Sequence, residues 1–330
     1  MNDKLHIIGI DQGFSSVKVS TRYGEFKFSN SVQEVGQSGA LFFASESNPS
    51  TKSFLYKNKN YIVGDDATGK TDYYRDVQYL LNYAPLMLVN TLYQLKDKAI
   101  TKHNIAALGI GLPLENVSSA TVYRNVLREF EVNNEKYVFP KINCYAQGVG
   151  AYADYVYNWG QKDISSKEQG FVWDIGENTM ILVSYDGFTV KKDGSRQYDK
   201  QGISAIYDII RESVRQRIER EPTITDLRTI LSTHKIKSFG EEIDCKDLVI
   251  PAIKKYLDIT YNTIMDNYKE KFSRCDKVIL AGGGSRILSA YIEQIFNKNK
   301  FFIMAPEPEY SNARGYRHIL LKKIRKEQSS

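Results

Sequence analysis

Two short stretches of this chain place an aspartate, a glycine and a hydroxyl residue at the same relative positions. Both stretches, residues 8–20 and residues 172–184, begin with an apolar run and end with β-forming residues. The three positions are Asp11, Gly13 and Ser16 in the first stretch, and Asp174, Gly176 and Thr179 in the second. Each pattern predicts a strand, a tight turn and a second strand, with a carboxylate just before the turn. A single Asp-x-Gly is a common structural turn, but its recurrence at matched offsets favours a site.

The first predicted hairpin carries groups that suit a phosphate. Gly13 allows several backbone N–H groups to point the same way, and Lys18 supplies a cation for the β- and γ-phosphates. Asp11 would repel a phosphate, so we expect it to hold Mg²⁺ through water molecules. The binding residues expected in this hairpin are Gly13, Phe14, Ser15, Ser16 and Lys18.

The second predicted hairpin is the counterpart on the side of the γ-phosphate. We expect Asp174 to contact a metal-bound water or to orient the attacking water, and with Asp11 it forms the candidate magnesium site. Backbone N–H groups in this turn would neutralise charge as a phosphoryl group leaves. The binding residues expected here are Gly176, Glu177, Asn178 and Thr179.

A glycine-rich segment follows the apolar run at residues 278–281. Gly282, Gly283 and Gly284 permit close backbone approach to a flat base or ribose, and Arg286 follows them as a further candidate for binding. The sequence contains no Gly-x-Gly-x-x-Gly dinucleotide turn. Two hairpins and one glycine-rich turn together predict a nucleotide clamp.

Predicted strands and helices alternate in both halves of the chain, which is typical of an α/β fold with largely parallel sheets. A polar stretch at 158–169 predicts the boundary between the halves. Expected strands include 25–29, 41–43, 53–56, 60–63, 105–112, a pair within 131–139 turning at Asn133-Asn134, 141–145, 187–191 before a turn at Asp193-Gly194, 277–281 and 300–304. Expected helices are 76–98, 118–130, 146–157, 202–220, one beginning at 222, 246–272, 285–297 and 311–326.

Composition is that of a soluble globular protein, with 330 residues, 42% apolar residues and a net charge of +6. This surplus is too small to imply nucleic-acid binding. Three cysteines without CxxC spacing and four scattered histidines argue against a disulfide or zinc framework, and they predict a cytoplasmic location. No apolar run approaches the roughly 20 residues of a membrane span, and the N-terminus leaves no room for a signal peptide.

These segments together resemble the actin/Hsp70/sugar-kinase ATPase superfamily over nearly the whole chain. The matching segments are 10–18 for phosphate-1, 145–152 for connect-1, 173–179 for phosphate-2, 278–286 for the adenosine motif and 311–316 for connect-2, where small residues let two helices cross. Residues 61–67, residues 108–113 and the compact length look most like the ParM-like plasmid-segregation actins. The resemblance implies two related actin/ribonuclease-H-like domains with mixed, largely parallel sheets, residues 1–160 and 161–330, and a nucleotide cleft between them.

The resemblance also implies roles for residues outside the two hairpins. Gln147 stands where the family places the Glu or Gln that positions the hydrolytic water; the alternative is a helix-start glutamine in a small-residue packing stretch. Gly202 begins a helix whose end the family presents to the nucleotide, and Arg228 is a candidate for a base or ribose contact. Glu177 and Asn178 replace the Gly or Thr common after the phosphate-2 glycine. The implied cofactors are Mg²⁺ and ATP, with GTP as the alternative nucleotide.

The first functional hypothesis is a filament-forming ATPase of the plasmid-partition type. Such a protein assembles with itself head to tail, hydrolyses ATP slowly and contacts DNA only through a ParR-type adaptor, without a membrane. The alternative is a small-molecule kinase or a non-polymerising ATPase switch of the same superfamily. No dedicated acidic base is identified in a substrate pocket, which argues against the kinase. An Hsp70-like chaperone would need a peptide-binding domain, and an MreB-like shape protein would need a membrane anchor.

Overall fold

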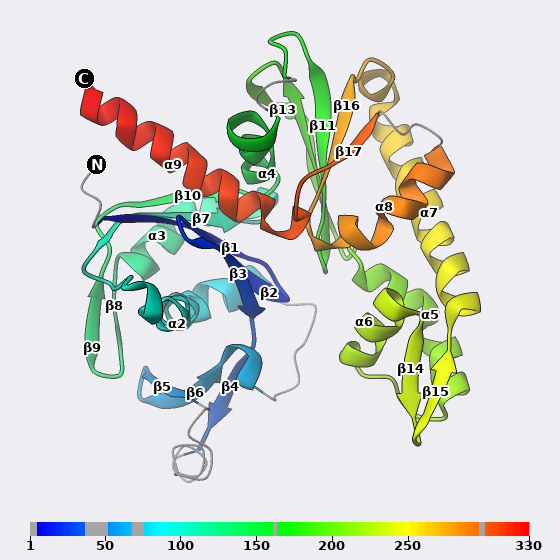
Figure 1. The fold of residues 1–330 in the computed structure, drawn as a ribbon, viewed down its shortest axis with the longest axis horizontal. Helices are drawn as coiled ribbons and strands as arrows, with labels where there is room; N and C mark the ends of the chain where they lie inside the picture. The colour runs from blue at the N-terminus through cyan, green and yellow to red at the C-terminus, as the bar shows by residue number, and fades with distance from the viewer. Residues whose placement is uncertain (1–4, 37–51, 68–75, 161–163, 297–300, 330) are drawn as a thin grey trace. The chain divides into compact units, whose positions relative to one another are not determined.

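Two units make up the chain in the computed structural model (Figure 1). The structure describes residues 5–36, 52–67, 76–160, 164–296 and 301–329, so the strand expected at 41–43 lies outside the described residues. The first unit comprises Met1–Asp163 with Tyr310–Ser330, and the second comprises Ile164–Glu309. The boundary falls inside the predicted polar stretch. The C-terminal helix, however, belongs with the first unit and not with the second half of the chain, where the sequence placed it.

The first unit contains a five-stranded sheet in the order β10-β7-β1-β2-β3. Its strands are β1 (His6–Gln12), β2 (Ser16–Thr21), β3 (Gly24–Ser29), β7 (Ile105–Leu112) and β10 (Ile142–Ala146). β1 pairs in parallel with β7, and β7 with β10, whereas β1–β2 and β2–β3 are antiparallel. The unbroken apolar run expected to form a buried strand is therefore confirmed as β7, between two parallel neighbours.

The second unit repeats this sheet in the order β13-β12-β11-β16-β17. Its strands are β11 (Gln169–Ile175), β12 (Thr179–Asp186), β13 (Thr189–Asp199), β16 (Lys277–Ala281) and β17 (Phe302–Met304). β11 pairs antiparallel with β12 and parallel with β16, so β11 occupies the place that β1 has in the first unit. The repeated Asp-x-Gly motif thus marks two sheets of the same topology, and the predicted α/β fold with two related domains is confirmed.

One expected turn is wrong. The sequence predicts that a strand ends before Asp193-Gly194, but β13 continues through these residues to Asp199. The β12–β13 register shifts between Leu182 and Ser184, and Gly194 adopts a φ of +90°. A glycine with positive φ is as typical of a bulge inside a long strand as of a turn between two strands, so local sequence alone does not separate the two.

Three smaller sheets lie outside the two large ones. They are β4-β6-β5, β8-β9 and β14-β15. Their strands are β4 (Val32–Val35), β5 (Ser53–Tyr56), β6 (Lys59–Val63), β8 (Glu129–Val132), β9 (Glu135–Val138), β14 (Lys235–Ser238) and β15 (Glu241–Asp244). The turn expected at Asn133-Asn134 is confirmed, with φ of 56° and 57° at the two residues. The β14–β15 hairpin is missing from the sequence-based assignment, because both strands have only four residues.

The helices of the first unit are α2 (Val77–Gln94), α3 (Ala120–Arg128), α4 (Val149–Asp154) and α9 (Ser311–Ser329); those of the second are α5 (Ser204–Ile218), α6 (Ile224–Thr233), α7 (Lys246–Ser273) and α8 (Gly283–Phe296). Short helical turns are η1 (Gly64–Asp66), η2 (Lys96–Lys98), η3 (Leu114–Ser119), η4 (Tyr155–Trp159) and η5 (Pro308–Tyr310). Asp76 caps α2 by accepting a hydrogen bond from the Tyr79 backbone N–H at 2.9 Å. α3 is shorter than expected, because residues 114–119 form a separate 3₁₀ turn. In the part of the chain that the structure describes, no helix combines the length and hydropathy needed to cross a membrane.

Glycines explain why α9 belongs to the first unit. Successive strand residues point to opposite faces of a sheet. Ile8 and Ile10 of β1, with the isoleucines and leucines of β7, face the apolar core shared with α2 and α3. Gly9, Gly109 and Gly111 face α9 on the other side of the sheet. A Cβ at Gly9 would lie 1.9 Å from the carbonyl oxygen of Ala313, and a Cβ at Gly111 would lie 2.5 Å from Tyr316 Oη. The glycines therefore let α9 approach the backbone of the sheet closely.

Candidate functional site

The turn between β1 and β2 gathers the charged residues expected in the first hairpin. The Gly13 N–H donates to the Ser16 carbonyl oxygen at 3.1 Å, which closes the turn. Asp11 and Lys18 are partners across the hairpin, with Lys18 Nζ 3.8 Å from Asp11 Oδ2. A Cβ at Gly13 would lie only 2.7 Å from the same ammonium nitrogen. Glycine at this position therefore gives the Lys18 ammonium room beside the turn.

Gln147 joins this pair from β10's side of the same sheet. It follows β10 directly, and its backbone N–H donates to the Leu112 carbonyl oxygen at 2.8 Å. Its side-chain Nε2 donates to Asp11 Oδ1 at 2.8 Å, and both side chains are buried. The structure thus brings together Asp11, Lys18 and Gln147, three residues that the sequence predicted separately.

A second set of residues holds the turn in place, and the sequence analysis missed it. Asn30 donates from Nδ2 to the Gly13 carbonyl oxygen at 2.8 Å and from its backbone N–H to the Ser15 carbonyl oxygen at 2.9 Å. Tyr123 Oη donates to Gln12 Oε1, and burial raises the pKa of this phenol. Only the meeting of β1, β3 and α3 in space reveals this support, since no motif links the three segments.

The turn between β11 and β12 is held by the start of α5. The Gly176 N–H donates to the Thr179 carbonyl oxygen at 2.9 Å, as in the first hairpin. The carbonyl oxygens of the turn accept hydrogen bonds from the next segment: Gly176 from Ile203 at 3.0 Å, Glu177 from Ser204 at 2.8 Å and Asn178 from Gly202 at 3.2 Å. Because C=O and N–H point in opposite directions across a trans peptide, the N–H groups of Glu177 and Asn178 point away from α5. Convergent backbone N–H groups of this kind bind anions.

Gly202 has a packing role in this arrangement. A Cβ there would lie 2.6 Å from the carbonyl oxygens of both Gly176 and Glu177. Its own N–H is taken by Asn178, so this N–H is not available to a phosphate. The structure therefore assigns Gly202 to positioning the turn. The predicted contact between Gly202 and a nucleotide stays a prediction, and the Gly202 N–H cannot make it.

Glu177 and Arg228, both predicted to bind a cofactor, contact each other. Arg228 Nε donates to Glu177 Oε1 at 2.9 Å, and the Glu177 side chain is mostly buried. Tyr207 lies beside this pair, and burial followed by the Glu177 charge raises its pKa. The guanidinium offsets the carboxylate that the turn carries in place of the usual Gly or Thr, which reduces its repulsion of an anion.

The glycine triplet divides into two packed residues and one open residue. A Cβ at Gly282 would lie 2.4 Å from Asp174 Oδ1, and a Cβ at Gly284 would lie 2.6 Å from Ile175 Cγ2. At Gly283 the nearest atom to such a Cβ is 3.9 Å away. Gly282 and Gly284 thus let the start of α8 approach β11, and Gly283 alone of the three leaves space for a ligand. Arg286 extends into solvent, with its side chain 67% exposed and 3.7 Å from Glu309.

The two buried aspartates, Asp11 and Asp174, are the magnesium candidates. No group of three or more potential metal-ligating His, Cys, Asp or Glu side chains occurs among the residues that the structure describes. Mg²⁺ keeps several waters and is commonly held by one or two carboxylates together with substrate phosphates. Asp11 in the first unit and Asp174 in the second each supply one buried carboxylate of this kind, and the magnesium site stays a prediction.

The predicted crossing of two helices through small residues is confirmed for α4 and α9. A Cβ at Gly315 would lie 1.7 Å from the Gly150 carbonyl oxygen. Asn312 Oδ1 caps α4 by accepting hydrogen bonds from the backbone N–H groups of Gly148 and Ala151 at 2.9 and 3.1 Å. Arg314 Nε donates to the fully buried Asp154 Oδ2 at 3.0 Å. Although Arg314 favours the charged carboxylate, burial dominates and raises the pKa of Asp154 to about 6.

Two family models match successive parts of the sequence. Residues 9–150 match the N-terminal domain of actin-like proteins, and residues 172–294 match the C-terminal part of archaeal MreB-like actin homologues. Together they cover more than half of the chain, with one Asp-x-Gly hairpin in each. The chain belongs to the actin-like proteins. A search of curated proteins finds no match.

Solved structures of actin-like proteins share the fold along nearly the whole chain. A 15-stranded ParM filament from Clostridium botulinum matches with a TM-score of 0.77 and 18% identity, covering 96% of this chain and 99% of that one. Ta0583, an archaeal actin homologue in complex with ADP, matches with a TM-score of 0.77 and 16% identity, covering 96% and 100%. The actin-like protein Alp7A matches with a TM-score of 0.75 and 15% identity, covering 98% of each chain. At these identities the likeness shows the fold.

Proposed function

We propose that this protein binds ATP as its Mg²⁺ complex through the two Asp-x-Gly hairpins. One observation carries the proposal: in both hairpins the carbonyl oxygens of the turn are tied back by a neighbouring segment. Asn30 does this in the first unit and the start of α5 in the second, at hydrogen-bond distances of 2.8–3.2 Å. Each turn therefore presents N–H groups beside a buried aspartate, which suits a phosphate chain with a bound cation.

The residues around each turn have distinct roles in this proposal. Lys18 neutralises charge on the β- and γ-phosphates, and Asp11 and Asp174 bind Mg²⁺ through waters. Gln147, fixed by its bond to Asp11, orients the attacking water. An amide orients water but is a poor base, so hydrolysis is slow. Gly283 leaves room for the base or ribose, and GTP is the alternative nucleotide to be compared directly with ATP.

We further propose that nucleotide binding drives self-assembly into a filament that disassembles after hydrolysis. Support comes from the shared fold with a ParM filament. A contact between two different surfaces of the same chain repeats without closing, which gives a filament. Segregation of plasmid DNA through a ParR-type adaptor is the role that this resemblance suggests, with the protein cytoplasmic and DNA bound by the adaptor.

Light scattering and phosphate release, followed after adding Mg-ATP or Mg-GTP at a series of protein concentrations, test these proposals. We expect a critical concentration, with phosphate release that follows assembly. Asp174→Ala should prolong the scattering because hydrolysis slows. Asp258→Ala, which removes an exposed aspartate of the same unit, is the matched control and should behave as the unaltered chain does.

The outcomes separate the functional classes. Nucleotide binding without scattering at any concentration refutes the filament and leaves a kinase or an ATPase switch. Absence of both binding and hydrolysis refutes the nucleotide site itself.

A further inference from the structure

The β14–β15 hairpin ends in an unusual turn. Its two central residues are Phe239 and Gly240, with φ of 48° and 88°. Turns with two positive φ values favour Asn-Gly or Gly-Gly, and a bulky residue in this region is a genuine outlier. Phe239 is also 82% exposed, the largest exposure among the exposed large hydrophobic residues of the described chain. Strain and exposed apolar area both disfavour this phenylalanine in the isolated chain, which points to a contact made by its ring.

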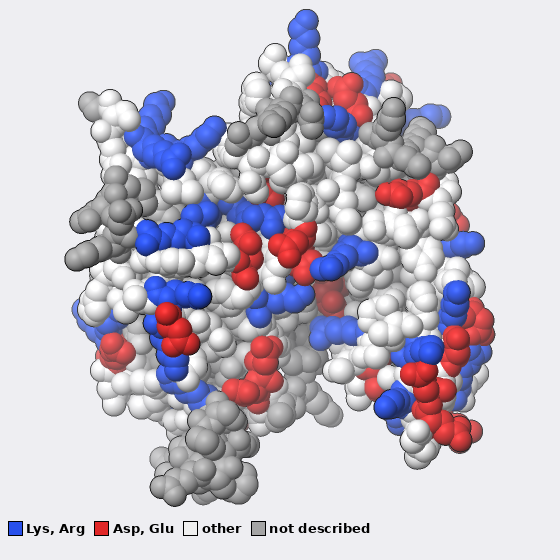
Figure 2. Space-filling model, viewed as in Figure 1, with Lys and Arg blue, Asp and Glu red and all other residues white. Residues whose placement is uncertain are grey.

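Charges on the hairpin are divided between its two faces. Glu242 lies opposite Lys237 in the register and accepts a hydrogen bond from Lys235 at 2.6 Å. Glu241 lies opposite Ser238, next to the turn, and forms no ion pair with any residue that the structure describes. Figure 2 shows acidic and basic side chains gathered over this hairpin. The end of the hairpin thus presents an aromatic ring together with a carboxylate that lacks a salt-bridge partner.

A cavity with the complementary chemistry lies in the first unit, beside α3. It has a volume of about 280 Å³, and its lining includes Arg124, Asn125, Arg128, Phe139 and Pro140. Arg124 donates to the Thr121 hydroxyl at 3.0 Å, but neither arginine forms an ion pair with a described residue. The two arginines are four residues apart on one helix, an arrangement that is mildly destabilising without an anion between them. The cavity therefore combines an apolar wall with two cations and no carboxylate.

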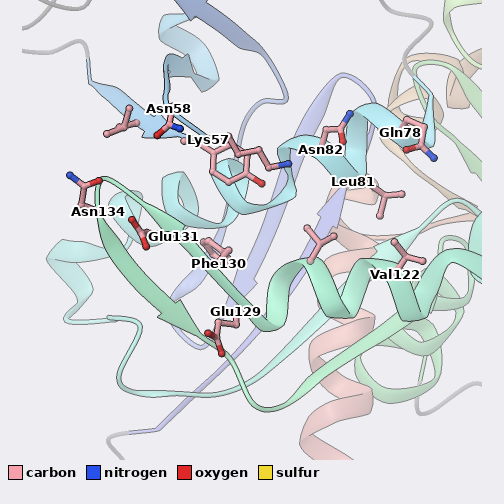
Figure 3. A pocket seen from close by; sticks show the side chains of 13 residues that line it. Lys57, Asn58, Gln78, Leu81, Asn82, Val122, Glu129, Phe130, Glu131 and Asn134 are labelled. Atoms are coloured by element: carbon pink, nitrogen blue, oxygen red, sulfur yellow. The ribbon is translucent and has the colours of Figure 1, made fainter.

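A larger cavity in the same unit is a poorer match. It measures about 560 Å³ and lies among the β5–β6 turn, α2, α3 and β8 (Figure 3). Glu129 and Glu131 line it together with Lys57, so its charges would repel Glu241. Charge therefore favours the cavity beside α3.

We propose that Phe239 and Glu241 of one copy of this chain bind the cavity beside α3 of a second copy. The ring of Phe239 packs on Pro140 and Ile142 at the apolar wall of the cavity. The carboxylate of Glu241 accepts hydrogen bonds from Arg124 and Arg128. Arginine–carboxylate bonds of this kind are charge-assisted and directional. Hairpin and cavity are different surfaces, so the contact propagates from copy to copy. This inference rests on the proposed self-assembly and names an anchor of its interface.

Assembly of the full chain with Mg-ATP provides the test, with critical concentration measured by light scattering. Phe239→Ala and Glu241→Lys should each raise the critical concentration about tenfold or more, as expected for anchor residues of an interface. Glu242→Lys is the matched control, because it makes the same charge change on the other face of the hairpin. Arg128→Glu should also weaken assembly, and combining it with Glu241→Lys should restore most of the loss. Mg-ATP binding should stay unchanged in every variant, which separates loss of contact from loss of folding.

Cross-linking distinguishes contact between copies from contact within one chain. Asn125→Cys protein and Phe239→Cys protein are mixed under mild oxidation at a concentration above the raised critical concentration, because Phe239→Cys also removes the ring. A disulfide between positions 125 and 239 should form only with Mg-ATP present, and neither protein alone should form it.

Three results overturn the inference while leaving the filament intact. These are assembly unaffected by Phe239→Ala, equal effects of Glu241→Lys and Glu242→Lys, and no rescue by the charge exchange. If binding of an acidic peptide from a separate protein is lost in Arg128→Glu while assembly is unchanged, the cavity serves that partner instead. Failure of the unaltered chain to assemble refutes the proposed filament and this contact together.

Discussion

Replacing Gly315 by alanine should weaken the first unit by separating α9 from α4. The added Cβ would lie 1.7 Å from the Gly150 carbonyl oxygen and 3.0 Å from the Asp154 backbone nitrogen. Ordinary van der Waals contact begins near 3.4 Å, so the helices must move apart by roughly 1.5 Å at this point. Both close atoms belong to backbone, so no side-chain rotation relieves the clash.

The magnitude follows from two contributions. Forcing extra volume into a packed site costs about 1–3 kcal/mol. Moving α9 away also lengthens the two hydrogen bonds by which Asn312 caps α4, and loss of a cap costs about 1 kcal/mol. We therefore expect the free energy of unfolding of the first unit to fall by about 3 kcal/mol. With a urea m-value of about 2–3 kcal/mol/M, the midpoint falls by about 1 M.

The two tryptophans make this measurable unit by unit. Trp159 lies in the first unit and Trp173 in the second, so a Trp173→Phe background leaves tryptophan fluorescence, excited selectively over the tyrosines, from the first unit alone. Gly36→Ala is the control, because a Cβ there meets nothing within 4 Å. It should leave the free energy of unfolding unchanged or raise it by up to about 1 kcal/mol, since alanine restricts the unfolded chain. Equal urea midpoints for Gly315→Ala and Gly36→Ala would refute the argument from close backbone approach.

Three further predictions concern the first unit. Asp154→Ala removes the carboxylate beside the buried Arg314 guanidinium and should lower the free energy of unfolding by about 3–5 kcal/mol. Replacing both partners, by Asp154→Leu with Arg314→Met, should cost less, as measured by urea unfolding of the single and double variants. A loss in the double variant equal to the sum of the two single losses contradicts this prediction. Burial, followed by neighbouring arginines, lowers the pKa of His318 to about 4 from 6.5, so the stability that it contributes is present above pH 6.5 and lost as pH falls towards 4. When the urea midpoint is measured from pH 7 to pH 4, His318→Gln should reduce its fall with decreasing pH. The raised pKa of Asp154 adds a slope of opposite sign, which both proteins share. Identical pH profiles for the two proteins would show that His318 does not contribute to this pH dependence. Gln147→Leu removes the amide that donates to Asp11 and should slow phosphate release by roughly 10²-fold. The affinity for Mg-ATP, measured by calorimetry, should change little. An unchanged rate of phosphate release would exclude Gln147 from the proposed mechanism.

Local sequence was sufficient to predict both central hairpins and the fold class. Asp11 and Gly13, like Asp174 and Gly176, lie within a few residues of each other, so strand propensity and turn chemistry determine the local geometry without distant contacts. The same holds for the Asn133-Asn134 turn and for β7, whose unbroken apolar run indicates burial on both faces. Small residues at 311–316 also indicated a close helix crossing, since only a small side chain permits backbones to meet.

Tertiary structure alone decided which residues meet and which end of the chain completes which unit. Glu177 and Arg228 are distant in sequence, and their ion pair forms only because α6 packs near the β11–β12 turn. Gly202 and Gly282 look in sequence like ligand contacts, yet their missing side chains accommodate neighbouring backbone and Asp174. α9 follows the second unit in sequence but packs on the glycines of β1 and β7. The periodicity of apolar residues indicates which face of a helix is apolar. Which part of the protein covers that face depends on long-range packing, which no local sequence pattern encodes.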